Sequence, residues 1–272
     1  MQNKILQAIF IISILFLSSC QKETQDDKGN VVRPDDDARI GQVVDNLFLN
    51  YSDTSASFTI LDRTDFWKLY NFADSMMLRM LNTGTFQYAT EFNWKIRVFE
   101  EGGVEKAFAA PGGYIYISRD MLLFLENEAD FAGLLAHTMM VSDGRYITGA
   151  LEDRYSISFL LDLALGAQPE LPNELMAAIS NISYAPVDAE AIDAATRDVI
   201  CNTDYDIRSF SSFVARAKYN TNNGTQIIEW LDMYQCPSSW ADDLYNTYDT
   251  NSCGGNVTNQ IDYEKIKLTI GK

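Results

Sequence analysis

The chain contains a single histidine, His137, within the stretch GLLAHTMMVSDGRY at residues 133–146. Two histidines four residues apart on one helix can bind zinc through their ring nitrogens, and a glutamate beside the first can activate metal-bound water. Here Thr138 stands at the position of that glutamate and Val141 at the position of the second histidine. The stretch therefore contains the first ligand of an H-E-x-x-H zinc motif without its base or its second ligand.

A helix beginning after Asn127 would carry His137. Asn127 is a typical N-cap residue, and Asp130 follows three positions later, which is typical of a helix start. Apolar residues then continue to Gly144, where helices often end. The pattern predicts a buried helix over residues 128–143.

The segments around this helix indicate a mixed fold. Residues 94–118 alternate β-branched and aromatic residues around Gly102–Gly103 and Gly112–Gly113, which predicts short strands joined by tight turns. Apolar residues recur at helical spacing before and after them, with Thr64 as the expected cap of the second helix. The order of elements predicts one α+β domain over residues 39–272. Its further helices are expected at residues 40–51, 64–81, 154–165, 171–182, 187–201, 207–219 and 226–235.

Residues 94–141 carry a family resemblance. KAFAAPGGYIYIS (residues 106–118) and NEADFAGLLAH (residues 127–137) occur in the order and spacing of the zinc metallopeptidases typified by the CAAX prenyl protease and the heat-shock protease HtpX, peptidase family M forty-eight. The chain resembles a degenerate member of that family. The resemblance implies a zincin-like metallopeptidase domain, mostly helical, with a small β-sheet before the active-site helix.

The resemblance also implies where the remaining site residues would lie. The family's later helix reads E-x-x-x-D or E-A-D, and alignment of Asp193 with the aspartate of E-A-D puts Ala191 at the zinc-binding glutamate. Glu190 would point about 100° away around the helix. A late T-H-P segment of the family aligns with Cys236. The former site positions are therefore expected at His137, Thr138, Val141, Ala191 and Cys236, with no catalytic residue, no bound metal and no cofactor, although zinc is the cofactor of the family.

These losses favour a pseudopeptidase that binds a peptide or protein in the former cleft and has a scaffolding role in the cell envelope. Zincin-type clefts hold an extended peptide along a strand edge, here expected at Tyr114, Ile115 and Tyr116. The alternative is a residual hydrolase of one of two kinds. Cys236 and His137 would form a thiol and base pair, or His137 would bind a metal with Asp188, Glu190 and Asp193 as non-standard ligands.

The first residues have the pattern of a targeting segment. Lys4 precedes the apolar run Ile5–Leu17, which is too short to span a bilayer, and LSSC ends at Cys20. This resembles a bacterial lipoprotein signal peptide over residues 1–19, followed by a lipidated Cys20 and an acidic tether over residues 20–38. We expect an extracytoplasmic protein held to the membrane by lipid, at the periplasmic face of the outer membrane or at the cell surface.

Charge and cysteine content narrow the range of partners and covalent links. The formal net charge is −17, which argues against a nucleic-acid partner because such a partner needs a basic surface. Three cysteines follow the expected lipidation site: Cys201, Cys236 and Cys253. Two of them can pair in an oxidising compartment, with Cys236–Cys253 the simplest pairing, but sequence does not fix the connectivity.

Overall fold

The computed structural model describes residues 29–55, 57–224, 226, 228–235, 237–249 and 253–271. The expected signal peptide, the expected lipidation site Cys20 and the expected site residue Cys236 lie outside the described residues. The fold is mixed α+β, with many helices around one four-stranded sheet, as the order of elements predicts. None of the helices formed by the described residues combines the length and apolar character that crossing a bilayer requires.

The ordered fold begins before residue 39. Helix α2 (Pro34–Thr54) starts with Pro34 at its first turn, a position where a missing N–H costs no helical hydrogen bond. The preceding backbone is also fixed, because Glu152 accepts the N–H groups of Val31 and Val32. Asp37 is fully buried and binds Arg145. The end of the expected tether therefore belongs to the folded domain.

The sheet has the order β1-β2-β4-β3, formed by Thr59–Ile60, Lys95–Glu100, Tyr114–Ser118 and Ala107–Ala110 respectively. Strand β4 pairs in parallel with β2 and antiparallel with β3. The chain turns between β3 and β4 through the short 3₁₀ segment Pro111–Gly113, so β3 lies outside β4. The expected peptide-binding edge at Tyr114, Ile115 and Tyr116 is therefore wrong: β4 is an internal strand, and these side chains are buried.

Helix α5 (Glu128–Asp143) is the centre of the domain. The Asn127 side chain accepts the N–H of Asp130 at 2.9 Å, which confirms the predicted N-cap. Every residue from Ala129 to Asp143 is buried, so the helix contacts protein on all sides rather than along one stripe. At Gly133 a Cβ would come within 2.4 Å of the Phe210 side chain, so glycine lets α10 (Ile207–Asn222) approach closely.

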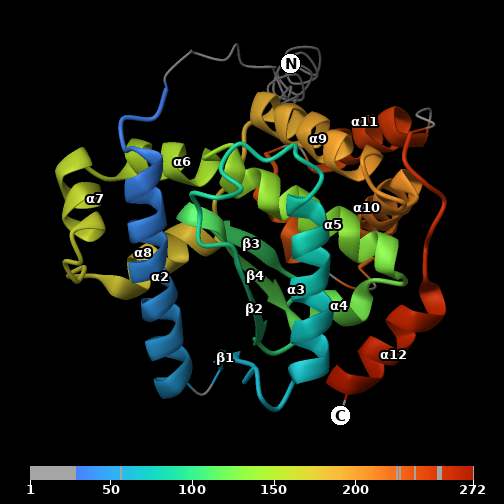
Figure 1. Ribbon diagram of the computed structural model, residues 1–272, viewed down its shortest axis with the longest axis horizontal. Coiled ribbons are helices and arrows are strands. Elements are labelled where there is room, and N and C mark those ends of the chain that lie inside the picture. Colours follow the sequence, from blue (N-terminus) through green and yellow to red (C-terminus); the bar gives the residue numbers. More distant parts are fainter. Residues whose placement is uncertain are drawn as a thin grey trace, which may run out of the picture.

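The helices divide into two groups around the sheet and α5. Helices α2 and α8 lie on one side of the sheet, whereas α5 separates it from α9, α10 and α11 at the upper right of Figure 1. The remaining bounds are α3 (Trp67–Leu81), α4 (Arg119–Phe124), α6 (Tyr146–Arg154), α7 (Ile157–Ala164), α8 (Pro172–Ser180), α9 (Pro186–Cys201), α10 (Ile207–Asn222), α11 (Pro237–Asp249) and α12 (Gln260–Ile270).

Several predicted boundaries differ from the structure. The helix expected at residues 154–165 is α7, which begins at Ile157 after a break at the end of α6. The segment expected as a helix at residues 226–235 forms only the short 3₁₀ helix η2 (Glu229–Met233). Helix α3 begins at Trp67 and has Phe66 rather than Thr64 at its N-cap. Asp62 instead accepts the N–H of Thr64, in a turn before the helix.

One disulfide links the end of α9 to the C-terminal segment. Cys201 pairs with Cys253 across a sequence separation of 52 residues, with their Cα atoms 5.0 Å apart. The simplest sequence-based pairing, Cys236–Cys253, is therefore wrong. Sequence proximity favoured it, whereas folding brings residues 254 and 255 against the loop after α9.

Candidate functional site

His137 lies in the core with only 1% of its surface exposed. Its Nε2 atom is 3.3 Å from Asp193 Oδ1, and the Tyr234 hydroxyl is 3.1 Å from Nε2 and 3.4 Å from Nδ1. Four aromatic rings surround the imidazole, with centroids between 5.6 and 6.2 Å away: Phe210, Trp230, Tyr234 and Trp240. The histidine is therefore packed and hydrogen-bonded within the interior.

Asp193 on α9 connects this histidine to α11. Its Oδ2 atom accepts the indole N–H of Trp240 at 2.7 Å, and its backbone carbonyl accepts the hydroxyl of Tyr248 at 2.7 Å. Burial raises the pKa of the Asp193 carboxyl above its usual value, and hydrogen bonds to His137 and Trp240 oppose that shift. The carboxyl group thus ties three elements together: α5, α9 and α11.

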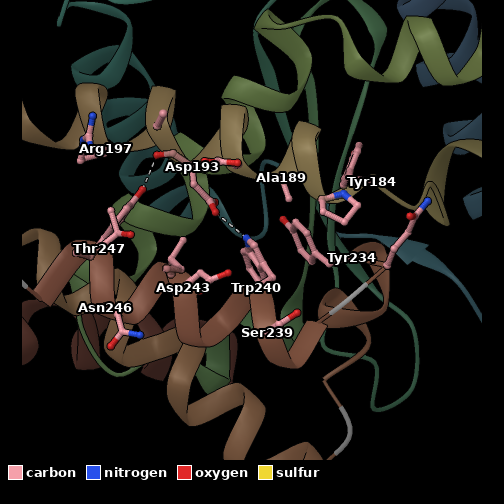
Figure 2. Close-up of a pocket in the computed structure, with 16 residues that line it drawn as sticks. Tyr184, Ala189, Asp193, Arg197, Tyr234, Ser239, Trp240, Asp243, Asn246 and Thr247 are labelled. Carbon is pink, nitrogen blue, oxygen red and sulfur yellow. Dashed lines mark hydrogen bonds between the residues drawn. The ribbon is translucent and has the colours of Figure 1, made fainter. Parts of the chain in front are cut away.

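A groove of about 690 Å³ lies between α9 and α11, and we call it the α9–α11 groove. Figure 2 shows α9 and α11 as its two walls, with Asp193 reaching across to Trp240. The rings of Tyr234 and Trp240 stack on each other with centroids 3.7 Å apart. The buried part of the groove surface is mostly apolar and aromatic: Tyr184, Ala189, Tyr234, Trp240, Leu244 and Tyr248.

Polar and charged side chains form the rims of the α9–α11 groove. Glu190 and Arg197 lie on the α9 wall, whereas Ser239, Asp243, Asn246 and Thr247 lie on the α11 wall. His137 does not line the groove, because Asp193, Tyr234 and Trp240 stand between the imidazole and the open space. The groove therefore lies over the histidine and gives no access to it.

The two neighbouring positions of the zinc motif are also buried away from the groove. Thr138 is 3% exposed, and its hydroxyl donates a hydrogen bond to the Leu134 carbonyl at 2.8 Å within the helix. Val141 is 3% exposed and belongs to the hydrophobic core. Neither side chain points into a space where a metal-bound water and a substrate would meet.

The expected third ligand position, Ala191, is corrected by the phase of α9. Asp193 faces His137, and a residue two positions away on a helix points about 160° from it. The α9 residues that line the groove include Ala189 and Asp193, and Ala191 is not among them. Position 189, one turn before Asp193, shares its face. Of the two family patterns, only E-x-x-x-D would place a ligand position on the face of Asp193.

The donor set does not fit catalytic zinc. Such a site normally has three protein ligands and an open position, whereas the described residues place a single carboxylate, that of Asp193, within contact distance of the His137 ring nitrogens. Within the part of the chain that the structure describes, no group of three His, Cys, Asp or Glu residues is placed to hold a metal ion. Of the proposed non-standard ligands, the structure brings only Asp193 to His137, and Glu190 lies at the groove rim.

Sequence reasoning missed the aromatic residues that pack around His137. Tyr234 and Trp240 flank Cys236, the expected site position that lies outside the described residues, so the thiol alternative has no described geometry. The sequence cue for this packing was the group of aromatic residues around position 236, but their spacing does not predict that they contact α5. No protein-family model matches the sequence, and a search of curated proteins found no match.

Proposed function

We propose that the protein is a lipoprotein of the cell envelope with a degenerate metallopeptidase-like domain, which binds a peptide or protein segment in the α9–α11 groove. The main support for this proposal is the position of His137 beneath this groove. The histidine is enclosed by aromatic rings, hydrogen-bonded to Tyr234 and 3.3 Å from the Asp193 carboxylate, while the groove directly over it remains open. Binding without zinc chemistry is the function that this arrangement supports best.

The dimensions and lining of the groove support this proposal. Its volume of about 690 Å³ lies within the range of roughly 300–1,000 Å³ that is typical of ligand pockets. An aromatic floor supplies apolar contact area, and polar rims supply hydrogen bonds, which is the usual anatomy of an interface. The groove replaces the strand edge as the expected peptide site, because β4 has strands on both sides.

The same proposal includes attachment of the chain to the outer membrane through lipid on Cys20, without nucleic-acid partners or a required cofactor. The described fold begins at Gly29, soon after Cys20 in sequence. The domain would therefore sit close to the membrane surface, because nine residues span at most about 30 Å when fully extended. Proteins or peptides of the envelope are then its accessible ligands.

Binding to randomised nonapeptide libraries, measured with the purified mature chain, tests the proposal. We expect binding that Ala194→Trp abolishes, because Ala194 lines the groove and an indole there would obstruct it. Ala167→Trp is the matched control, since Ala167 is exposed and lies beyond α7, away from the groove. No binding to any library, or equal binding by both variants, would contradict a binding role for the groove. Stoichiometric zinc in the purified chain would overturn the non-catalytic assignment.

A further inference from the structure

We infer that the α9–α11 groove selects a segment bearing a lysine or arginine side chain. This inference rests on the proposed function and specifies the class of its ligand. It follows from three features: the sign of the charges in the groove, their placement on opposite walls, and the aromatic surface between them.

The charges of the groove are mainly negative. Three of its four charged lining residues are acidic: Glu190, Asp193 and Asp243. Arg197 is the basic one, and its guanidinium lies 3.5 Å from Asp198, a neighbour that does not line the groove. The carboxylate of Asp198, outside the groove, therefore offsets part of the positive charge of Arg197. A cationic ligand would be attracted to this groove, and an anionic ligand would be repelled.

The acidic groups lie on both walls of the groove. Glu190 lies on the α9 wall and Asp243 on the α11 wall. Asp193 reaches from α9 toward Trp240 on α11 (Figure 2). Glu190 is close enough to raise the pKa of Asp193 further, so the two groups share one electrostatic environment. A positive charge held between the walls would relieve that like-charge repulsion.

The floor suits the stem and head of a long basic side chain. Tyr234 and Trp240 present stacked aromatic rings, and Leu244 adds an aliphatic surface. Lysine and arginine can pack their methylene stems on such surfaces while keeping the charged end near carboxylates. A guanidinium or ammonium group is also attracted to aromatic faces.

A buried hydroxyl at one end of the groove adds an independent observation. Tyr184 lines the groove with only 3% of its surface exposed, and its hydroxyl has no hydrogen-bond partner among the described residues. Buried polar groups are usually paired, and an unpaired one is energetically costly. The oxygen is covered in this conformation, so a ligand N–H donor would satisfy it only after the surrounding side chains move apart; lysine and arginine carry several such donors.

Four nonapeptide libraries with a fixed central Arg, Lys, Gln or Glu and randomised flanks test the inference by fluorescence anisotropy. We expect the Arg and Lys libraries to bind at least about ten-fold more tightly than the Glu library at low salt, with the difference shrinking as salt rises. The double variant Glu190→Gln/Asp243→Asn should weaken the basic libraries several-fold and leave the Gln library nearly unchanged.

Two further variants sharpen the test. Arg197→Gln should tighten binding of the basic libraries, because it removes the positive charge of the groove. Asp53→Asn, at an exposed position near the end of α2, removes a negative charge outside the groove and should change nothing. Glu190 and Asp243 are exposed, so their substitution should preserve the fold, which circular dichroism checks.

The outcomes separate the inference from the proposed function. Equal affinity for all four libraries, blocked by Ala194→Trp, would overturn the charge preference and leave a binding groove. Preference for the Glu library would overturn it as well. Failure of all four libraries would remove the proposed function itself.

Discussion

Replacing His137 by phenylalanine distinguishes a packed core histidine from a remnant catalytic group. The substitution keeps an aromatic ring among Phe210, Trp230, Tyr234 and Trp240 but removes both ring nitrogens. Asp193 Oδ1 then loses the group 3.3 Å away, and the Tyr234 hydroxyl loses its imidazole contacts. The main expected effect is therefore lost stability.

The size of that loss follows from the buried carboxyl group. Removing one partner of a buried charged pair costs about 3–5 kcal/mol, and leaving a neutral buried group unsatisfied costs about 1–3 kcal/mol. Asp193 lies between these limits, because burial raises its pKa and makes protonation easier, while Oδ2 keeps the Trp240 hydrogen bond. We expect a loss of about 3 kcal/mol, or a fall in Tm of about 6–12 °C for a chain of this size.

Thermal and urea unfolding at pH 7 and pH 4 measure this effect. The loss should be smaller at pH 4, where a protonated Asp193 no longer places an uncompensated charge beside the new phenyl ring. Tyr234→Phe is the control, since it removes one hydroxyl and should cost about 1 kcal/mol. A fall in Tm below 2 °C for His137→Phe, with the same value at both pH values, would refute the view that the imidazole is a structural partner of Asp193.

Three other outcomes are expected. The free energy of unfolding of Asp193→Asn, measured with urea, should rise relative to that of the wild type as pH increases from 4 to 7. Because the pKa of Asp193 is raised in the folded state, the wild type has a stability contribution below the unfolded pKa that is lost as pH rises through the folded pKa. Asparagine does not titrate and has no such contribution to lose. Cys253→Ser should lower the free energy of unfolding by about 2–5 kcal/mol under oxidising conditions, and equal stability of both proteins there would contradict the Cys201 link. The double variant Thr138→Glu/Val141→His should unfold at a lower temperature and bind no stoichiometric zinc by metal analysis, because both positions are buried in packed surroundings; a stable zinc-loaded variant would show that the helix can still present ligands.

Local sequence patterns predicted those parts of the fold that depend on contacts between residues close together in the sequence. Asn127 caps α5 as its type and position indicate, and the Gly112–Gly113 pair forms the turn between β3 and β4. Both glycines have positive φ, which explains why the turn requires them. The broad α+β assignment likewise follows from the sequence of helical and strand patterns.

Strand order could not be predicted in the same way. Alternation identified the Tyr114–Ser118 segment as a strand, but alternation is the same for an edge strand and an internal strand. Its internal place depends on β2, whose pairing partners are distant in sequence, and on the return of β3 outside it. The nearly continuous apolar run YIYI in β4, typical of a strand covered on both faces, was the local hint, and the structure shows every residue of β4 buried.

The candidate site shows how long-range packing determines the role of a residue. A motif search identifies His137 by its neighbours in sequence, yet its partners come from residues 193, 210, 230, 234 and 240 on other elements. Aromatic rings from the η2 to α11 segment occupy the space that ligands and water would need. Because they pack there, a histidine placed at position 141 would face the core, where it would have no open space for a metal ion. The groove lies outside these rings, and its charged rim residues Glu190 and Asp243 are exposed to solvent, where a ligand can contact them.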